Sequence, residues 1–377
     1  MANVVSSPPP SRPRVAFAMD QIAGHVTRYH NLRGAVDDDG SLDPRWIEVD
    51  YYSESGRLER LADAVRIVPG YVRGVSRGAI EMRRGLAAVD KDVIFTNASI
   101  ALFFVRRFRA TPTMFDFDST PVQLDAMPDY TPTPDPAPLA KLKFVLQRRL
   151  FESVVALQAW SHWAARSVVD DYGIDSDKVF VNPPGVHLDR WQPVERSSPG
   201  NDGPIRVLFV GSDFARKGGH DLLSWHAASG RSDIEIDLVT REPVDVRPGV
   251  RVHDDLTPNS PELLELYRRA HVFVLPSRGE CFGIAAIEAM ATGLPVVQST
   301  VGGSADIVDD GVSGLLVAPE RPGELGAAIE SIVDDTTRWG SMSRRGREIA
   351  TERFDVRANA AVTIERLHSL AAAASAD

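Results

Sequence analysis

Short uninterrupted runs of apolar residues recur along this chain, and each is bounded by glycine, proline or small polar residues. Residues 271–275 (His-Val-Phe-Val-Leu) form one such run and residues 295–298 (Pro-Val-Val-Gln) form another. Their length and their flanks predict two buried strands. Residues 284–292 between them favour a helix, and Gly293-Leu-Pro295 supplies its stop. Strand, helix and strand in this order predict a parallel βαβ unit.

Runs of the same kind in the first half predict a second sheet. They cover residues 14–19 (Arg-Val-Ala-Phe-Ala-Met), 93–97 and 113–118. A chain of 377 residues is long enough for two domains, each with a sizeable core. The predicted fold class is therefore α/β. No apolar run approaches 18 residues, so the sequence predicts no transmembrane helix.

The loop after residues 271–275 carries the candidate chemistry. Ligands of parallel sheets bind beyond the carboxyl ends of the strands, where Glu280 lies. The next helix begins in the four residues that follow: Cys281, Phe282, Gly283 and Ile284. Their open N–H groups favour a phosphate. Glu288 lies just over one helical turn after Ile284 and can accept two charge-assisted hydrogen bonds from a diol such as a ribose. The E-x7-E spacing is weak alone, but this context predicts a cavity for hydroxyl-rich, phosphorylated ligands.

The segment from Glu280 to Val297, with Val301-Gly-Gly-Ser304 and residues 311–317 after it, resembles the donor-binding half of a retaining family 4 glycosyltransferase, in the glycogen-synthase-like group. Three further segments match in order. Residues 205–218 resemble the strand and basic loop that hold the donor diphosphate, and residues 179–191 resemble the crossing between domains. Phe354 and the Ala-rich stretch behind it resemble the last helix. The resemblance is specific from about Ser161 to Phe354 and implies the GT-B fold, two Rossmann-like domains facing across a cleft.

The resemblance implies an enzyme that moves a sugar from a UDP- or GDP-sugar to an acceptor hydroxyl and keeps the anomeric configuration. Arg216 and Lys217 would neutralise the leaving diphosphate, and Glu280 would hold sugar hydroxyls and steady positive charge at the ring. Glu288 would hold the ribose. The acceptor would be a glycan, a lipid-linked sugar or a small molecule, in polysaccharide, glycolipid or glycoconjugate biosynthesis. No metal or other cofactor is implied.

The resemblance implies further donor-binding residues in the second half of the chain. They are Gly211, Cys281, Phe282, Gly283, Ile284 and His253. His253 falls where the family usually has a short apolar strand beside the nucleobase, so it either stacks on the base or faces solvent. A helix N-terminus lowers the pKa of a thiol, so Cys281 is expected to be reactive, with a buried and inert cysteine as the alternative.

Candidate acceptor-side residues lie in the first half. Gly24 and His25 follow the first predicted strand and resemble a pair found in inverting GT-B transferases, where the histidine is the general base. This leaves an inverting mechanism as the alternative, disfavoured because that group lacks the Glu280/Glu288 arrangement. Asp116 and Asp118 alternate on a strand, so a metal site is geometrically feasible. We expect none, because the diphosphate already has two basic residues. Many relatives carry a histidine where this chain has Asp118, Ser119 and Thr120.

The expected domain boundaries follow from the resemblance and from composition. Residues 1–13, rich in Ser and Pro, predict a disordered leader rather than a secretion signal. Residues 14–186 form the acceptor-side domain, 187–202 the linker and 203–356 the donor-binding domain. Residues 357–377 predict a helix that packs back on the first domain. A single cysteine excludes an internal disulfide and fits a cytoplasmic location.

Residues 131–138 alternate with proline and predict an extended connector before a basic helix at 139–155. Related transferases that act on lipids often dock on membranes through such helices. Here Leu139, Leu146 and Leu150 share one face, whereas Phe144, Phe151 and Val155 occupy another. Apolar residues on two sides favour a packed domain helix, and peripheral contact with the inner face of a membrane is the alternative.

Charge excludes one class of partner. Residues 1–200 hold 24 Lys/Arg and 25 Asp/Glu, whereas residues 201–377 hold 18 and 27. A nucleic-acid-binding protein would show an excess of basic residues, so no nucleic-acid partner is expected.

A nicotinamide dehydrogenase also has Rossmann domains, but residues 211–216 lack the G-x-G-x-x-G spacing that its pyrophosphate needs. A non-catalytic sugar-nucleotide sensor stays open, since it would keep the donor site and lose the acceptor pocket.

Overall fold

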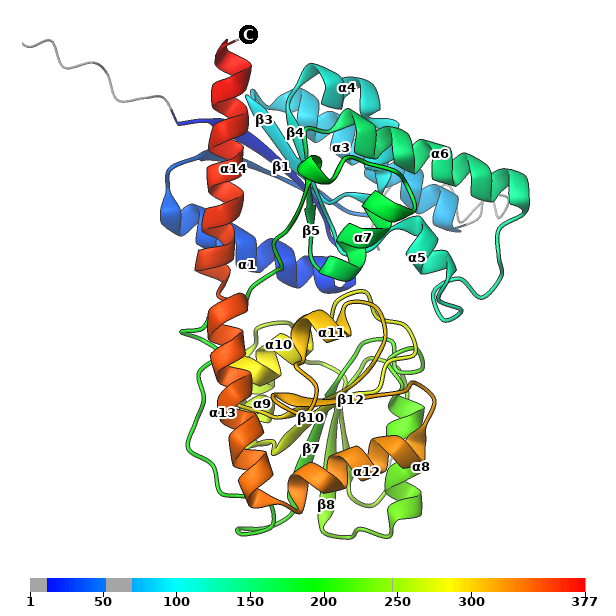
Figure 1. The fold of residues 1–377 in the computed structure, drawn as a ribbon, viewed down its shortest axis with the longest axis vertical. Coiled ribbons are helices and arrows are strands. Elements are labelled where there is room, and N and C mark those ends of the chain that lie inside the picture. The colour runs from blue at the N-terminus through cyan, green and yellow to red at the C-terminus, as the bar shows by residue number, and fades with distance from the viewer. Residues whose placement is uncertain (1–11, 52–69, 246, 377) are drawn as a thin grey trace, which may run out of the picture.

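The computed structural model of the chain describes residues 12–51, 70–245 and 247–376 and places two α/β domains one above the other (Figure 1). Nearly all of the predicted leader, residues 1–13, lies outside the described residues. Each domain contains a six-stranded sheet whose paired strands all run parallel. The predicted α/β class is confirmed. None of the described helices is long and apolar enough to cross a membrane.

The first sheet has the strand order β2-β1-β3-β4-β5-β6. Its strands are β1 (Arg14–Asp20), β2 (Asp43–Val49), β3 (Val93–Thr96), β4 (Thr113–Phe117), β5 (Ala156–Ala159) and β6 (Val179–Val181). The strands predicted at 14–19, 93–97 and 113–118 are β1, β3 and β4, each within a residue of the expected end. β1, β3 and β4 are almost entirely buried, which is why they read as continuous apolar runs rather than alternating ones.

The second sheet has the order β12-β11-β10-β7-β8-β9. Its strands are β7 (Ile205–Val210), β8 (Ile234–Val239), β9 (Val250–His253), β10 (Val272–Leu275), β11 (Val296–Ser299) and β12 (Gly314–Val317). The predicted βαβ unit is β10, α10 (Ile284–Ala291) and β11. Because β7 and β10 are neighbours at the centre of the sheet, the loops that follow them open at the same edge.

Helices cover both faces of each sheet. In the first domain they are α1 (Ala23–Asp39), α3 (Gly70–Ala88), α4 (Val105–Ala110), α5 (Pro121–Asp125), α6 (Ala137–Ser153) and α7 (His162–Asp170), with 3-10 turns at Ser99–Phe103 and Ser176–Lys178. In the second they are α8 (Gly219–Ser229), α9 (Pro261–Arg269), α10, α11 (Ser304–Ile307), α12 (Pro322–Val333) and α13 (Thr336–Arg353). Serine side chains cap the N-termini of two of these helices. The hydroxyl of Ser161 accepts from the N–H of Ala164 in α7, and the hydroxyl of Ser260 accepts from the N–H of Leu263 in α9.

The last two helices follow one another along one edge of the molecule, α13 on the second domain and α14 (Val356–Ala376) on the first, where α14 packs on α1 and β3 (Figure 1). The chain crosses between domains beside its start. There the N–H of Val186 donates to the carbonyl of Phe354 (2.9 Å), and that of Val356 donates back to Val186 (3.1 Å). A Cβ on Gly185 would come within 2.5 Å of the Val356 backbone, so only glycine allows this approach.

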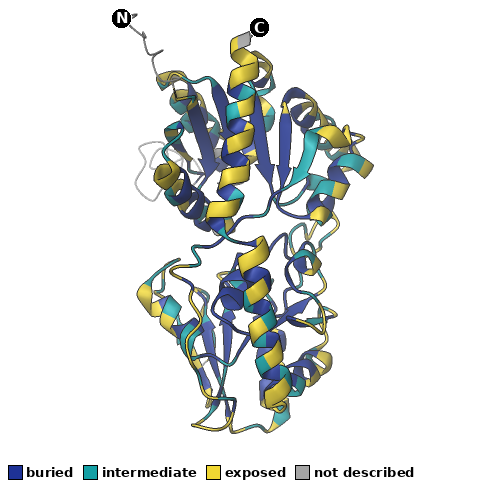
Figure 2. Ribbon diagram, turned by 60° about the vertical axis from the view of Figure 1, so that its left-hand side comes forward, coloured by how far each residue is buried: buried dark blue, intermediate teal, exposed yellow. Residues whose placement is uncertain are grey.

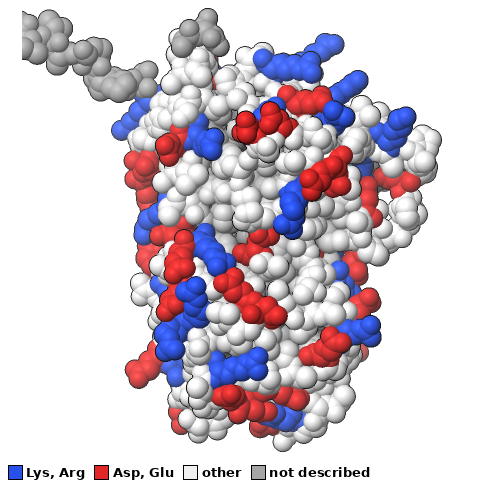
Figure 3. Space-filling model, viewed as in Figure 1, with Lys and Arg blue, Asp and Glu red and all other residues white. Residues whose placement is uncertain are grey.

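Burial follows this layering (Figure 2). The strands and inward faces of the helices are buried, whereas the outer faces of α13 and α14 are exposed. The second domain has one large apolar core around β7 and β10, and the first has a core on each face of its sheet. On the face shown in Figure 3, acidic and basic side chains intermingle over both domains.

Candidate active site

The loops after β7 and β10 build the centre of the candidate site. The N–H of Arg278 donates to the carbonyl of Arg216 (2.8 Å) and ties the two loops together. Gly218, at φ +74°, lies so close that an added Cβ would be 1.9 Å from the carbonyl oxygen of Pro276. A Cβ on Gly211 would lie 2.9 Å from the side chain of Lys217. Glycines at these points allow the basic loop to fold onto its neighbour.

Lys217 and Glu280 meet at this edge of the sheet. The ammonium group of Lys217 donates a hydrogen bond to the carboxylate of Glu280, and both side chains are largely buried. The hydroxyl of Ser277 lies 3.5 Å from the same carboxylate oxygen. Two residues assigned to one site by the resemblance, 63 positions apart in the chain, are thus in direct contact.

Arg216 is held by three acceptors. Its Nε donates to Asp213 (2.8 Å), and its Nη1 donates to the carbonyl of Gly279 and to the hydroxyl of Tyr130 (both 2.8 Å). The guanidinium carbon also lies 4.4 Å from the centre of the Tyr130 ring. Within the described part of the chain, no group accepts a hydrogen bond from Nη2, so this amino group is left for a ligand.

Tyr130 belongs to the first domain and reaches across the cleft to Arg216. It ends a turn in which its N–H donates to the carbonyl of Met127 (3.0 Å). Burial, with the nearby Cys281 and Glu280, raises the pKa of the Tyr130 hydroxyl, so it is a neutral phenol at any physiological pH. No motif in the sequence pointed to Tyr130, because 86 positions separate it from its partner.

The start of α10 packs against the glycine pair that the resemblance singled out. Gly303 donates its N–H to the carbonyl of Cys281 (3.0 Å), and Gly302, at φ +57°, lies where an added Cβ would be 1.7 Å from the carbonyl oxygen of Glu280. No side chain caps α10 at Gly283, which leaves the first N–H groups of the helix open to a ligand. The candidate phosphate-facing residues Phe282, Gly283 and Ile284 lie at this end.

The expected reactivity of Cys281 is contradicted. The side chain is buried, and burial together with the negative charge of Asp118 raises the pKa of the thiol well above its usual range. Desolvation of the thiolate outweighs the helix N-terminus, because the thiol has almost no contact with water. Cys281 is a small packing residue in this loop rather than a thiolate.

Glu288 lies on α10 and is almost fully buried against α9. The hydroxyl of Tyr267 donates to one of its carboxylate oxygens (2.9 Å). Burial raises the pKa of Glu288 to about 7, and the hydrogen bond from Tyr267 opposes that shift only in part. A carboxyl that exchanges its proton near neutrality is a group whose binding properties depend on pH.

His253 ends β9 and is fixed by an acidic neighbour. Its Nε2 lies 2.8 Å from Asp237, which also accepts from Arg269 (2.8 Å). The ring is partly exposed, with one nitrogen engaged. A role beside the nucleobase stays a prediction.

The acceptor-side residues line the facing domain. An added Cβ on Gly24 would lie 4.0 Å from the side chain of Ile284, so the first turn of α1 faces the start of α10. Trp160 contacts Phe282 edge to face across the same gap, with ring centres 5.9 Å apart. The two walls of the predicted cleft are therefore adjacent in this structure.

Both ring nitrogens of His25 face protein groups. Nδ1 lies 3.0 Å from the amide nitrogen of Asn97, and Nε2 lies 3.5 Å from the carboxylate of Asp118. Burial alone would lower the pKa of His25, but the hydrogen bond and charge of Asp118, with Asp20 and Asp116, raise it above its ordinary value. The same contact lowers the pKa of Asp118 although burial opposes this.

Asp116 is part of a buried ion pair. It lies 3.4 Å from the guanidinium of Arg28 and accepts from the amide of Gln158 (2.7 Å). Within the described residues, no group of three or more His, Cys, Asp or Glu side chains is arranged to hold a metal ion. Asp116 and Asp118 thus have separate partners, Arg28 and His25.

Comparison with known proteins finds relatives of the second domain. Residues 204–335 match the sequence model of the family described as "Glycosyl transferases group 1". This part of the chain is therefore similar to group 1 glycosyltransferases. The D-inositol 3-phosphate glycosyltransferase of Geodermatophilus obscurus is 36% identical over 195 residues, covering 45% of this chain and 43% of that protein. The protein of that name from Arthrobacter sp. is 31% identical over 241 residues, covering 59% and 57%. The matched region thus spans about half the length of these relatives.

Solved structures share the fold of the whole chain. Sucrose-phosphate synthase from Thermosynechococcus elongatus superposes with a TM-score of 0.76 at 20% identity, covering 96% of this chain and all of that one. Anabaena HepE in complex with UDP-glucose superposes with a TM-score of 0.69 at 17% identity, covering 95% and 100%. WaaG, a glycosyltransferase involved in lipopolysaccharide biosynthesis, gives 0.67 at 16%, covering 94% and 99%. The predicted family resemblance and the GT-B architecture are confirmed.

Proposed function

We propose that this protein is a retaining glycosyltransferase that moves a sugar from a nucleotide diphosphate sugar to an acceptor hydroxyl. The observation that carries the proposal is the contact of Lys217 with Glu280, beside the fixed guanidinium of Arg216, at the carboxyl edge of a group 1 domain. Parallel sheets bind ligands at this edge. The donor is a UDP- or GDP-sugar, and HepE, which shares the fold, is described as a complex with UDP-glucose.

The basic pair supplies charge stabilisation. An ammonium group has three donors, so Lys217 can keep its bond to Glu280 and still donate to phosphate oxygens. The free Nη2 of Arg216 presents two further donors without a change in the plane of the guanidinium. Negative charge grows on the diphosphate as the glycosidic bond breaks, and donors already in place cost no reorganisation at that moment. Glu280 would hold sugar hydroxyls and steady the positive charge at the ring.

The acceptor hydroxyl needs a base, and in this proposal the leaving diphosphate takes its proton on the face from which it departs. The contacts of both ring nitrogens of His25 support the diphosphate, rather than His25, as the base. A general base needs a free nitrogen directed at the acceptor, whereas both nitrogens of His25 contact Asn97 and Asp118. An inverting reaction with His25 as base is the second candidate, favoured by the resemblance of Gly24-His25 to the pair in inverting transferases and by the proximity of His25 to Asp118.

The proposal includes no metal, because the basic residues carry the phosphate charge. The acceptor is a glycan, a lipid-linked sugar or a small molecule, and the activity belongs to polysaccharide, glycolipid or glycoconjugate biosynthesis in the cytoplasm. Peripheral membrane contact is the less favoured alternative for α6. Phe144 stacks on Tyr172 and Phe151 is buried, so most of its apolar side chains are used inside the domain, although Leu139 and Leu142 are exposed.

The test is donor turnover. Thermal shift against a panel of nucleotide sugars identifies the donor, since a ligand at 100 times its dissociation constant adds about 2.7 kcal/mol of stability. Arg216→Ala and Lys217→Ala should then each lower turnover of that donor by roughly 10²–10³. Lys141→Ala, which changes an exposed lysine on α6, should leave turnover unchanged. Donor binding without transfer or slow hydrolysis would instead identify a sugar-nucleotide sensor.

A further inference from the structure

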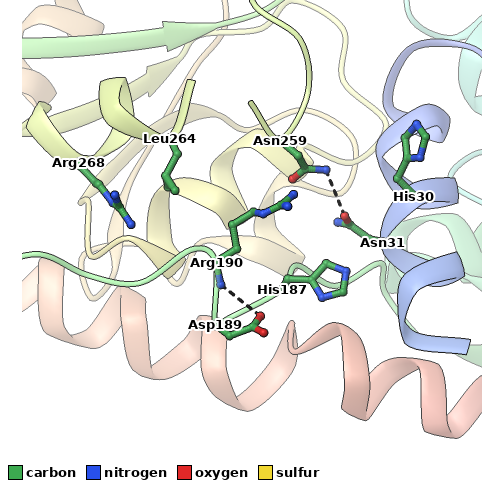
Figure 4. A pocket seen from close by; sticks show the side chains of 8 residues that line it. All are labelled: His30, Asn31, His187, Asp189, Arg190, Asn259, Leu264 and Arg268. Atoms are coloured by element: carbon green, nitrogen blue, oxygen red, sulfur yellow. Dashed lines mark hydrogen bonds between the residues drawn. The ribbon is translucent and has the colours of Figure 1, made fainter. Parts of the chain in front are cut away.

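A separate cavity of about 530 Å³ lies where the two domains meet beside the chain crossing (Figure 4). We call it the hinge cavity. Its lining comes from α1, from the segment after β6 and from α9 with the loop before it: His30, Asn31, His187, Asp189, Arg190, Asn259, Leu264 and Arg268. This volume is in the range of about 300–1,000 Å³ that small-molecule sites occupy.

The hinge cavity is distinct from the candidate donor site. Arg268 lies in the last turn of α9, just before β10 begins, whereas Glu280 follows the opposite end of β10. On α1, His30 is five residues beyond His25, which turns it by roughly 140° to another face of the helix. None of the eight lining residues belongs to the donor-binding set. The cavity and the candidate donor site therefore share no lining residue.

The lining carries uncompensated positive charge. Among the described residues, the guanidinium groups of Arg190 and Arg268 have no ion-pair or hydrogen-bond partner. The one carboxylate of the lining, Asp189, already accepts from Arg357 (2.9 Å). Burial lowers the pKa of His187, so that ring is neutral at pH 7. In a chain with a net charge of −10, this cavity is a local site for an anion.

Two buried polar atoms at the cavity have no partner. Arg268 Nε is a donor and Asn259 Oδ1 is an acceptor, and both are buried and unsatisfied in the described structure. The amide nitrogen of Asn259 is already engaged, because it donates to Asn31 across the domain boundary (3.4 Å; Figure 4). Buried polar atoms are nearly always hydrogen-bonded, so unpaired ones indicate a missing partner. Both atoms have almost no accessible surface, so a ligand in the cavity could satisfy them, as an acceptor for Arg268 and a donor for Asn259, only after the side chains turn toward it.

We propose that the hinge cavity binds a small phosphomonoester that also carries hydroxyl groups, such as a sugar phosphate. The phosphate oxygens accept from Arg190 and Arg268, which suits the planar donors of arginine. A hydroxyl of the same molecule donates to Asn259 Oδ1 once the side-chain amide turns toward the cavity. Because the lining comes from both domains, the occupant stabilises the arrangement of the domains seen here. The site goes beyond the proposed transfer reaction, since no step of that reaction uses it.

The experiment is calorimetric titration of the full-length protein with glucose 6-phosphate, inorganic phosphate and glucose. Each titration is run alone and with saturating UDP, or with GDP where the thermal-shift panel shows that the donor carries guanine, so that the candidate donor site is occupied. We expect glucose 6-phosphate to bind at least as tightly with the nucleotide as without it, because both ligands favour the same arrangement of the domains. It should bind more tightly than inorganic phosphate, and glucose should not bind. No transfer activity is measured, so failure here leaves the proposed function untouched, and loss of transfer leaves this site untouched.

Variants assign the binding to the cavity. Arg190→Ala and Arg268→Ala should each weaken glucose 6-phosphate binding by roughly tenfold or more. Arg106→Ala, at an exposed arginine of α4, is the matched control and should bind normally. Asn259→Gly keeps the positive φ of 62° and should reduce the preference for glucose 6-phosphate over phosphate.

Three outcomes would overturn the proposal: no binding of glucose 6-phosphate at millimolar concentration, competition by UDP, or full affinity in both arginine variants. Equal affinity for inorganic phosphate and glucose 6-phosphate would overturn the hydroxyl contact at Asn259.

Discussion

Arg216 illustrates how a single residue can be prepared for one ligand. Asp213, Gly279 and Tyr130 fix its guanidinium through Nε and Nη1 and leave Nη2 free. Two of these partners are in the same domain as Arg216, but Tyr130 belongs to the other. The orientation of Arg216 is therefore complete only when the two domains are close. Tyr130 is a positioning residue, because it acts on the diphosphate through Arg216.

Tyr130→Phe keeps the ring beside Arg216 and removes only the hydroxyl. We expect kcat to fall about tenfold with little change in the KM for the donor, because the lost hydrogen bond to a charged group matters most where phosphate charge grows. The unfolding free energy should change by less than about 1 kcal/mol.

The control for Tyr130 is Tyr29→Phe. Its hydroxyl also contacts charged groups, Glu48 (2.8 Å) and Arg33 (2.6 Å), but away from the cleft, so kcat should be unchanged. Equal activity of Tyr130→Phe and wild type would show that the contact does not position Arg216 for the reaction.

At the scale of elements, the packing of α10 on α9 decides the charge of Glu288. Its carboxyl has a pKa of about 7 in the folded chain against 4.5 ordinarily. A raised folded-state pKa contributes stability at pH below 4.5, and this contribution is lost as the pH rises through 7. Relative to Glu288→Gln, the wild type should therefore lose about 3 kcal/mol of unfolding free energy between pH 4.5 and pH 8.

Urea unfolding of both proteins over this pH range measures the difference. Nucleotide diphosphate affinity should follow the opposite trend, rising from pH 6 to pH 8 in the wild type only, if ionised Glu288 accepts from the ribose. A flat difference in stability would place the Glu288 carboxyl in water rather than between helices.

Contact between the loops after β7 and β10 depends on Gly218. An alanine there meets both the positive φ of 74° and the carbonyl of Pro276. Gly230 has nearly the same φ, 65°, but open space around it. Gly230→Ala should cost only the backbone strain, about 1–2 kcal/mol of unfolding free energy, whereas Gly218→Ala should cost more than about 3 and abolish turnover. Similar losses in the two variants would mean that the loops can move apart freely.

The sequence predicted those elements whose signal is local. Buried strands and the helix at 284–292 show as apolar runs and good helix formers, and the glycine-rich motifs identified the loops around Glu280. Tyr130 could not be predicted, since its role depends on a contact between domains. The expected thiolate at Cys281 was wrong because a helix N-terminus visible in sequence competes with burial, which is not visible there. The partners of Asp116 and His25 depend likewise on helix α1 packing over the sheet.

At the scale of the whole molecule, the way the two domains face each other bears on the stereochemistry of the proposed reaction. The donor domain supplies the charged loop, and the first domain supplies a wall on which His25 is already paired on both sides. Because both ring nitrogens of His25 are engaged, the proposed route sends the proton of the acceptor to the departing diphosphate, which is possible only on the face that the diphosphate leaves. The product should therefore keep the anomeric configuration of the donor.

Proton NMR of the anomeric centre during turnover distinguishes the two courses, since the coupling constant of the first product formed reports its configuration. His25→Gln, which keeps a hydrogen-bonding side chain beside Asn97 and Asp118, should retain most of the activity, because the imidazole does not transfer the proton. An inverted product, together with a loss of roughly 10²-fold or more in this variant, would make His25 the general base and replace the retaining mechanism. A retained configuration in the wild-type product, together with full loss of activity in His25→Gln, would instead assign His25 to acceptor binding.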